Sequence, residues 1–341
     1  MSSMPDSPVL VEVLRGTTVE SRHRGAFVVI DARGGVVAAA GEINAPVYPR
    51  SAIKPLQALP LVESGAADAF RLTPRELALS CASHRGEDAH VAAVRAWLGG
   101  IGLGPDALEC GAHMPNDGAA ADALVRAGAA PSQMHNNCSG KHSGFLCTAV
   151  HQGEDPRGYI GPDHKVQRRV AAAIAEMTDT DLSAAPCGCD GCGIPTYGVP
   201  LRGLALGMAR MMTGHGLGPT RAAASRRLLD AMGAEPFYVS GSGTFVTDCM
   251  RASAATVRVK TGAEGVYAAA LPQRGLGVAL KIEDGAKRAS DMAIAALLQA
   301  LGCFDDTARG ALAPHLAPVL RNVAGREVGT IRATDLLTRA M

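Results

Sequence analysis

The sequence has few lysines, and this shortage is informative. Its 341 residues hold six lysines against 27 arginines. Arginine serves wherever a surface positive charge is enough, but its guanidinium stays protonated in proteins, so it cannot replace a lysine that must act as a neutral amine. Burial or a neighbouring cation can lower the pKa of a lysine from its usual value of about 10.4. The six remaining lysines are therefore candidates for neutral-amine chemistry.

Other features that the chain has little of exclude further classes of protein. Aromatic residues make up 4% of the sequence and the formal net charge is +1, which does not suit nucleic acid or an anionic membrane as the main partner. No apolar run approaches the roughly 20 residues that a membrane helix needs. Residues 1–6 lack the basic-then-apolar order of a secretory signal, so we expect a cytoplasmic protein. Nine cysteines, an odd number, do not suit a closed disulfide framework and favour reduced thiols that could serve a metal.

Strand patterns lie at both ends of the sequence, and helical patterns lie between them. Apolar runs rich in β-branched residues predict strands over 9–13, 25–31, 36–41, 255–260, 265–270, 277–282 and 329–332. Helical periodicity, caps and flanking prolines predict helices over 73–81, 88–98, 163–177, 201–212, 220–232 and 286–301. The turn at 32–35 is typical of a hairpin between two of the strands.

This order predicts an α/β (α+β) fold in which one antiparallel sheet, built from both termini, packs against a helical lobe. We expect a single catalytic unit over residues 8–336. Its sheet part would comprise 8–50 and 255–336, and its helical lobe 51–254. The cleft would lie between the sheet and the lobe.

A serine and a lysine three residues apart begin the helical region. Pro55 fits only the first turn of a helix, so the helix should begin at or just after Ser51. Residues i and i+3 share a helix face, so the Lys54 amine can reach the Ser51 hydroxyl and, when neutral, take its proton. The N–H groups and dipole of the helix start would stabilise an oxyanion there. The alternative is a helix cap beside a solvated lysine.

The motif Lys260-Thr261-Gly262 follows a strand pattern near the C-terminal end of the helical region. In serine β-lactamases and penicillin-binding proteins, a Lys-Thr-Gly strand lies along the cleft facing a Ser-x-x-Lys helix, and the two motifs have the same order here. Ser83 could meet Lys260 as a second serine–lysine pair. The alternatives are an edge-strand lysine before a turn and, for the neighbouring His84, a hydrogen-bonded structural histidine.

Cysteines concentrate in two short segments. Cys138 precedes Lys141 in one of them, and three cysteines share the Gly-rich segment Cys187–Cys192. Closely spaced thiolates are typical zinc ligands, although this spacing is not that of a zinc ribbon. A redox-sensitive thiol cluster and small buried side chains are the alternatives. The other cysteines lie in apolar surroundings and are predicted to be core: Cys81, Cys110, Cys147, Cys249 and Cys303.

Together these motifs resemble those of the rhizobial-type (class 3) L-asparaginases. The resemblance runs from about residue 8 to the C-terminal region and is carried, in order, by Pro49–Lys54, Cys81–His84, Asn136–His142, Asp190–Cys192 and Lys260–Val266. It implies a fold similar to serine β-lactamases and glutaminases, a homodimer, and hydrolysis of L-asparagine to L-aspartate and ammonia. It also implies a zinc ion at the substrate site.

The resemblance assigns roles to individual residues. The implied catalytic residues form two pairs, Ser51 with Lys54 and Ser83 with Lys260. The implied zinc ligands are Cys138, Lys141 and Cys192. The implied substrate-binding residues are Arg50, His142, Asp190 and Gly241, of which His142 and Asp190 would lie next to the zinc ligands.

Two positions depart from the family pattern. Cys189 adds a thiol that could compete with Cys187 or Cys192 for the metal. Thr244 stands where the family typically has a basic residue, which bears on substrate affinity.

We expect covalent amide hydrolysis. Lys54 would deprotonate Ser51, which attacks the side-chain carboxamide, while the second pair relays protons and helps hold the oxyanion. The rival scheme makes Ser83 the attacking group, and the sequence does not separate the two. A zinc ion bound by Lys141 needs a deprotonated amine, so its affinity should rise with pH. We expect that ion to orient the substrate.

Three other functions compete with this one. A β-lactamase or penicillin-binding protein shares the motifs, and hydrolysis of nitrocefin would reveal it. The substrate of a glutaminase differs by one methylene, worth only about 1–3 kcal/mol of discrimination, so ammonia release from the two amino acids decides. A zinc or redox sensor would explain the cysteines but leaves both serine–lysine pairs without a purpose.

Overall fold

Strands from both ends of the chain form one antiparallel sheet in the computed structural model, which describes residues 7–253 and 255–338. The strand order is β11-β12-β1-β2-β10-β9-β8, and β3 pairs with β2 beside this path. Every pairing is antiparallel. The predicted sheet, completed by both ends of the chain, is therefore confirmed. Its strands are β1 (Val9–Arg15), β2 (Thr18–Asp31), β3 (Val36–Ala40), β8 (Arg258–Gly262), β9 (Val266–Leu271), β10 (Leu276–Ile282), β11 (Val319–Arg321) and β12 (Glu327–Ala333).

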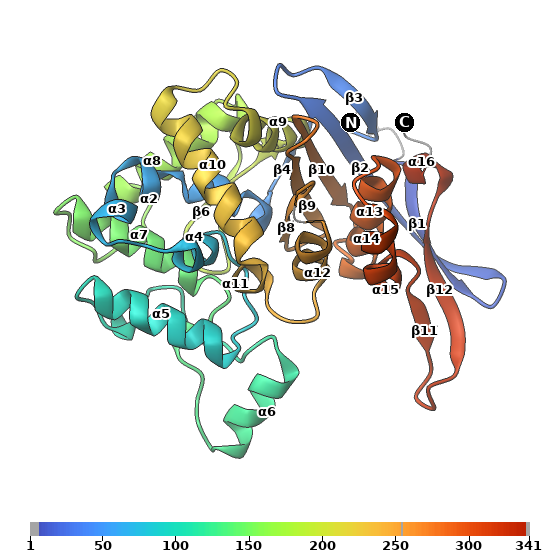
Figure 1. Cartoon of the computed structure of the whole chain (residues 1–341), viewed down its shortest axis with the longest axis horizontal. Helices are drawn as coiled ribbons and strands as arrows, with labels where there is room; N and C mark the ends of the chain where they lie inside the picture. Colours follow the sequence, from blue (N-terminus) through green and yellow to red (C-terminus); the bar gives the residue numbers. More distant parts are fainter. Residues whose placement is uncertain (1–6, 254, 339–341) are drawn as a thin grey trace.

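Most helices between β3 and β8 gather beside the sheet, whereas α9 of this group and the later helix α13 pack against it (Figure 1). The first group contains α1 (Lys54–Gln57), α2 (Leu59–Glu63), α3 (Ala66–Ala69), α4 (Pro74–Ser80), α5 (Asp88–Gly100), α6 (Gly118–Arg126), α7 (Ser139–His151), α8 (Lys165–Thr178), α9 (Leu201–Thr213), α10 (Pro219–Ala234), α11 (Pro236–Ser240) and α12 (Phe245–Ala252). The second group contains α13 (Lys287–Ala300), α14 (Asp306–Ala311), α15 (Ala313–Leu316) and α16 (Asp335–Thr338). No helix in residues 7–253 and 255–338 combines the length and apolar character that a membrane span needs.

Short elements complete the chain. The segments Arg50–Ile53, Pro105–Ala107 and Gln133–His135 form 3-10 turns. Two small antiparallel pairs join β4 (Pro46–Val47) to β7 (Val199–Pro200) and β5 (Cys187–Cys189) to β6 (Pro195–Tyr197).

The centre of the large sheet is covered on both faces. All residues of β9 are buried, and helices α9 and α13 both pack against β9 and β10. A strand that is buried along its whole length reads as a continuous apolar run, which is what the sequence shows over Val266–Leu271. The end of the sheet that carries β8 therefore lies beside the helices.

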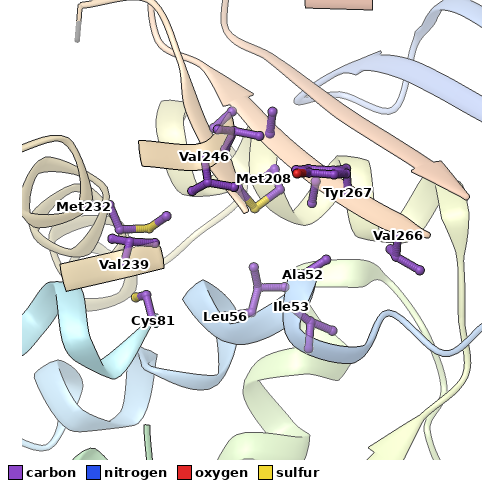
Figure 2. Packing of buried hydrophobic residues seen from close by; sticks show 14 of the residues in the cluster. Ala52, Ile53, Leu56, Cys81, Met208, Met232, Val239, Val246, Val266 and Tyr267 are labelled. Carbon is purple, nitrogen blue, oxygen red and sulfur yellow. The ribbon is translucent and has the colours of Figure 1, made fainter. Parts of the chain in front are cut away.

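Core packing holds the first turn of the helical region against this end of the sheet. Figure 2 shows Ala52, Ile53 and Leu56 in one apolar cluster with Val266 and Tyr267 of β9. Close approach at the end of β8 needs a glycine. A Cβ atom on Gly262 would lie 2.6 Å from the carbonyl oxygen of Pro49. Packing and backbone therefore place the Lys260 strand directly beside the turn that holds Ser51 and Lys54.

The predicted elements agree with the structure except at their ends. The hairpin across residues 32–35 forms as β2 and β3, and the predicted helices are present. The clearest difference is β2, which begins at Thr18, not at Gly25. Residues 18–24 pair with β1 and alternate charged and polar side chains that are mostly exposed, so they lack the apolar pattern that marks the buried half of the strand.

Candidate active site

Ser83 lies just beyond the end of α4 in a segment held by backbone hydrogen bonds. Its N–H donates to the carbonyl of Val239 in α11 at 2.9 Å, and the N–H of His84 donates to the carbonyl of Asn137 at 3.2 Å. The buried ring of His84 also lies 2.8 Å from the hydroxyl of Ser139, the first residue of α7. His84 therefore has the structural role considered for it, and the Ser83–His84 segment is held by two separate parts of the chain, α11 and residues 137–139.

Two lysine amines converge on the hydroxyl of Ser83. Nζ of Lys260 lies 2.8 Å from Oγ of Ser83, and Nζ of Lys54 lies 3.0 Å from the same atom. Both lysine side chains are fully buried, whereas Ser83 is partly exposed. A hydroxyl between two buried amines is the arrangement that serine activation by lysine requires.

The structure places the Lys54 amine on Ser83 and not on Ser51. Nζ of Lys54 donates to the carbonyl of Ala82 at 2.5 Å and also lies 3.2 Å from Sγ of Cys138. Within the described part of the chain, Lys54 makes no hydrogen bond with Ser51. Helical spacing allows the Ser51–Lys54 contact, but three acceptors in the interior occupy the three donors of the amine.

Burial lowers the pKa of Lys260 well below that of an ordinary lysine, and the positive charge of Lys54 lowers it further. Lys260 is fully buried in the middle of β8, where its amine also donates to the carbonyl of Thr261 at 2.7 Å. Both influences disfavour the ammonium form. Lys260 is therefore the lysine of this site best suited to act as a neutral base.

Cys138, Lys141 and Cys192 meet in a buried cluster next to this pair. Nζ of Lys141 donates to Sγ of Cys192 at 3.1 Å, and the thiols of Cys138 and Cys192 share a hydrogen bond. Lys54, which contacts both Cys138 and Ser83, connects the cluster to the serine. The structure thus brings together the three residues that the family resemblance implies as zinc ligands.

The residues of this cluster shift one another's pKa values. A hydrogen bond from Cys192 and the charges of Lys54 and Lys141 hold the pKa of Cys138 well below that of an ordinary thiol, against the effect of burial. The bond to Cys138 and burial raise the pKa of Cys192. Burial lowers the pKa of Lys141, but its interactions with Cys192, Cys138 and Asp190 outweigh burial, so that this pKa is raised. The arrangement favours a thiolate at Cys138.

The other two cysteines of the Gly-rich segment lie apart from the cluster. Cys187 and Cys189 are exposed on β5, whereas Cys192 is buried against Lys141. Cys187 pairs across the small sheet with Tyr197. Of the three candidate thiols, Cys192 is therefore the one that the geometry places with Cys138.

The buried cluster fits a zinc ion by donor type. Two thiols and one amine provide three soft or borderline donors, and zinc sites at substrate-binding positions commonly have three protein ligands. In residues 7–253 and 255–338, no group of three or more His, Cys, Asp and Glu side chains is placed to hold a metal ion. The cluster contributes two such side chains, and its third donor is the amine of Lys141.

Arg50 and Asp190, both implied to bind substrate, bind each other. Nε of Arg50 lies 2.8 Å from Oδ1 of Asp190. Burial raises the pKa of Asp190, but the charges of Lys141 and Arg50 outweigh burial, and the pKa is lowered. Arg50 has the positive φ of 49°, which is uncommon outside glycine. The pair lies beside the cluster of Cys138, Lys141 and Cys192, where Oδ2 of Asp190 is 3.9 Å from Sγ of Cys192.

His142 is buried behind the cluster. Its Nδ1 lies 2.6 Å from the hydroxyl of Tyr159, and its Nε2 is buried without a hydrogen-bond partner among the described residues. Burial, with the nearby charges of Lys141 and Lys54, lowers the pKa of His142 well below its ordinary value. A neutral imidazole next to Lys141 is thus built into the site.

A pocket of about 400 Å³ opens onto both candidate serines. Its lining includes Ser51, Ser83, Arg85, Asn137, Thr244 and Glu264. Thr244 also caps the start of α12, where its hydroxyl accepts from the N–H of Thr247 at 3.3 Å. A larger cavity of about 500 Å³ between α13 and β12 is lined mainly by apolar side chains and contains none of the predicted site residues.

Gly241 follows Ser240, which lines this pocket, and has a φ of 80°. A Cβ atom at Gly241 would lie 2.8 Å from Cγ of Arg85 and 2.6 Å from Oε1 of Glu87. The glycine is therefore required for backbone conformation and for space, because a side chain there would displace Arg85.

Sequence reasoning missed several parts of the site. Arg85 lines the pocket two residues after Ser83, but nothing in its surroundings along the chain distinguishes it from the other arginines. Tyr159 is fully buried against His142, and no motif contains it. Glu264 falls inside a motif that carried the family resemblance, and the signal that would single it out, a φ of 57°, is visible only in three dimensions.

Comparison with known protein families shows to which family the chain belongs. Residues 11–333 match the model of the family described as L-asparaginase II. No curated protein matches the sequence. The match covers nearly the whole chain and contains every residue of the site described above, so the family resemblance predicted from the motifs is confirmed.

Two solved structures are similar to the chain at low identity. A β-lactamase from Mycobacterium bovis is 15% identical, with a TM-score of 0.38 over 85% of this chain and 94% of that protein. A mutant of simvastatin synthase from Aspergillus terreus is 12% identical, with a TM-score of 0.38 over 78% of this chain and 87% of that protein. These likenesses are too weak to carry any inference about the chemistry or the substrate.

Proposed function

Because the chain belongs to the L-asparaginase II family and is therefore a hydrolase of amides, we propose that it converts L-asparagine to L-aspartate and ammonia by serine–lysine catalysis. The observation that supports this most directly is the position of Ser83, whose hydroxyl lies 3.0 Å from Lys54 and 2.8 Å from Lys260 at a pocket. Of the two schemes that the sequence leaves open, the geometry favours the one in which Ser83 attacks.

The reaction begins with proton transfer from Ser83 to a neutral Lys260. Oγ of Ser83 forms a bond to the carboxamide carbon, and the proton of the hydroxyl passes to Nζ of Lys260, 2.8 Å away. The C–N bond then breaks, and the ammonium of Lys260 returns the proton to the nitrogen, which leaves as ammonia. Water then attacks the carbonyl carbon of the acyl-enzyme, with Lys260 again as base. Aspartate is released, and the hydroxyl of Ser83 is regenerated.

Lys54 and Ser51 have supporting roles in this scheme. Lys54 orients the hydroxyl of Ser83 by a hydrogen bond of 3.0 Å, and its charge lowers the pKa of Lys260. Ser51 lines the same pocket and offers a hydroxyl to the substrate. The two lysines therefore act on one serine, each in a different way.

Cys138, Lys141 and Cys192 would hold a zinc ion in this protein. When bound there, zinc supplies a Lewis acid that orients the substrate and polarises its oxygens. The chain's own contribution is the buried donor set, together with Asp190 and Arg50 beside it. Binding requires Lys141 to lose its proton, so zinc affinity should rise with pH.

Cys192→Ala is expected to remove zinc and to weaken substrate binding while turnover at saturating L-asparagine persists. The measurement is zinc per chain by mass spectrometry, with expected loss from about one ion to nearly none. Cys189→Ala is the matched control, since this exposed thiol lies three residues away and its removal should leave the zinc content unchanged. If Cys192→Ala abolished turnover even at saturating substrate, an orienting role for the ion would be wrong.

The proposed function is tested by ammonia release from L-asparagine, L-glutamine and, as a further probe, hydrolysis of nitrocefin. We expect asparagine to be preferred over glutamine by about 10-fold to 200-fold, the range that one methylene provides, and nitrocefin to remain intact. Faster release from glutamine would make the protein a glutaminase. Zinc binding without hydrolysis of either amide would indicate that the protein is a zinc or redox sensor.

A further inference from the structure

The pocket at the two serines is lined by charged side chains that the proposed chemistry does not use. They are Arg85, Glu264 and Lys287. Arg85 follows Ser83 by two residues, and Glu264 follows Lys260 by four, so each lies on the same segment as a catalytic group. A substrate whose carboxamide reaches Ser83 would have its remaining atoms near these charges.

Arg85 has donors to spare. Its Nε is buried without a hydrogen-bond partner among the described residues, and its ion pair with Oδ2 of Asp117 is long, at 3.5 Å. An unmet buried donor of this kind costs free energy that a ligand recovers on binding. The planar guanidinium is also the group best shaped to bind a carboxylate through two parallel hydrogen bonds.

The side chain of Arg85 is held in place from behind. Arg85 fills the space beside Gly241, where an added Cβ atom would lie 2.8 Å from its Cγ and 2.9 Å from its Cδ. The carboxylate of Glu87 accepts from the N–H and the hydroxyl of Ser242, both at 2.8 Å, and so fixes the loop that presses on Arg85. A cation preorganised in this way binds at a lower entropic cost than a free surface arginine.

Glu264 supplies a negative charge in the same pocket. It lies in the turn between β8 and β9 with a φ of 57°, a conformation that costs free energy in a residue with a side chain and that is often found at ligand sites. The amine of Lys281 holds the turn by donating to the backbone carbonyl of Glu264 at 2.7 Å. Among the described residues, the carboxylate of Glu264 makes no hydrogen bond.

Lys287 is a weaker candidate for binding an anion. Its amine is paired with Asp291 one helical turn away, and its side chain is 66% exposed, against 31% for Arg85. An exposed, already paired lysine has less to gain from a ligand. Arg85 is therefore the cation that the pocket presents to a substrate.

We propose that Arg85 binds the α-carboxylate and Glu264 the α-ammonium group of the substrate. These two contacts would select the free, zwitterionic amino acid over an asparagine that is N-acylated or part of a peptide. This inference rests on the proposed function and adds how the pocket chooses its substrate.

The test uses three amides and two charge-removing variants. L-Asparagine carries both α groups, succinamic acid lacks the α-ammonium, and 3-aminopropanamide lacks the α-carboxylate. Arg85→Met should raise KM at least about tenfold for L-asparagine and succinamic acid but leave 3-aminopropanamide unchanged. Glu264→Gln should raise KM by a similar factor for L-asparagine and 3-aminopropanamide but leave succinamic acid unchanged. Lys287→Met, the matched control, should leave all three unchanged.

A binding experiment separates this inference from the proposed function. L-Asparagine is titrated calorimetrically into Ser83→Ala and into Ser83→Ala combined with Arg85→Met or Glu264→Gln. Weakening of at least about tenfold in both double variants supports the charge recognition even if wild-type protein releases no ammonia from asparagine. Equal losses for all three amides, losses caused by Lys287→Met, or no binding of L-asparagine by Ser83→Ala would overturn it.

Discussion

Ser83→Ala is expected to lower kcat for L-asparagine by at least about 10⁴-fold, the loss typical of removing a nucleophile from a catalytic unit. The reason is geometric, because Oγ of Ser83 is the atom on which both buried amines converge, at 2.8 Å and 3.0 Å. Ammonia release from purified protein measures the loss, and an unchanged melting temperature shows that the fold is intact.

Ser51→Ala is the matched control for this prediction. Ser51 lines the same pocket but makes no hydrogen bond to Lys54 within residues 7–253 and 255–338, so its removal should cost no more than about 10²-fold. Trapping of the acyl-enzyme followed by peptide mass spectrometry should place the adduct on Ser83. A larger loss in Ser51→Ala, or an adduct on Ser51, would restore Lys54 as the base and Ser51 as the nucleophile.

Local patterns were sufficient to predict the sheet and most helices. The apolar runs over Val266–Leu271 and Leu276–Ile282 are long, β-branched or small, and bounded by turns, so their strands are legible without a structure. By contrast, β11 was not predicted from the sequence, because it has only three residues, of which two are exposed. Periodicity detects burial on one or both faces, so it missed β11 but found β8, the strand at the other end of the sheet, which has two buried residues.

Of the two predicted serine–lysine contacts, Ser83 with Lys260 is present, whereas Lys54 contacts Ser83 and not Ser51. Motif identity selected both lysines and both serines, and helix geometry predicted that Lys54 would reach Ser51. The structure shows instead that tertiary contacts decide where a long flexible side chain goes, since Ala82 and Cys138 supply acceptors that no local pattern reveals. Arg50 and Asp190 are a similar case, because a pair 140 residues apart in sequence is found only in the fold.

Lys260→Arg is expected to be as inactive as Lys260→Met, with kcat/KM lowered by at least about 10³-fold in both. A guanidinium of similar reach keeps the positive charge but cannot release its proton, so it cannot serve as a base. This pair of variants tests directly why a chain that uses arginine so freely retains a lysine in the middle of β8. Activity in Lys260→Arg above a tenth of the wild-type value would show that only the charge of Lys260 is needed.

The pH dependence gives the same prediction a second readout. Burial and Lys54 lower the pKa of Lys260 well below 10.5. Lys260 therefore stays neutral at pH values at which an ordinary lysine is protonated. We expect kcat/KM to fall only as the pH drops through this lowered pKa. Stability follows the same direction: between the two pKa values the unfolded chain binds the extra proton, so the contribution of Lys260 to folding becomes more favourable as pH rises. Lys260→Met removes the buried amine and should therefore keep or raise the melting temperature at neutral pH while abolishing activity. A melting temperature that falls sharply in Lys260→Met would mean that Lys260 acts mainly as a structural partner of Ser83 and not as its base.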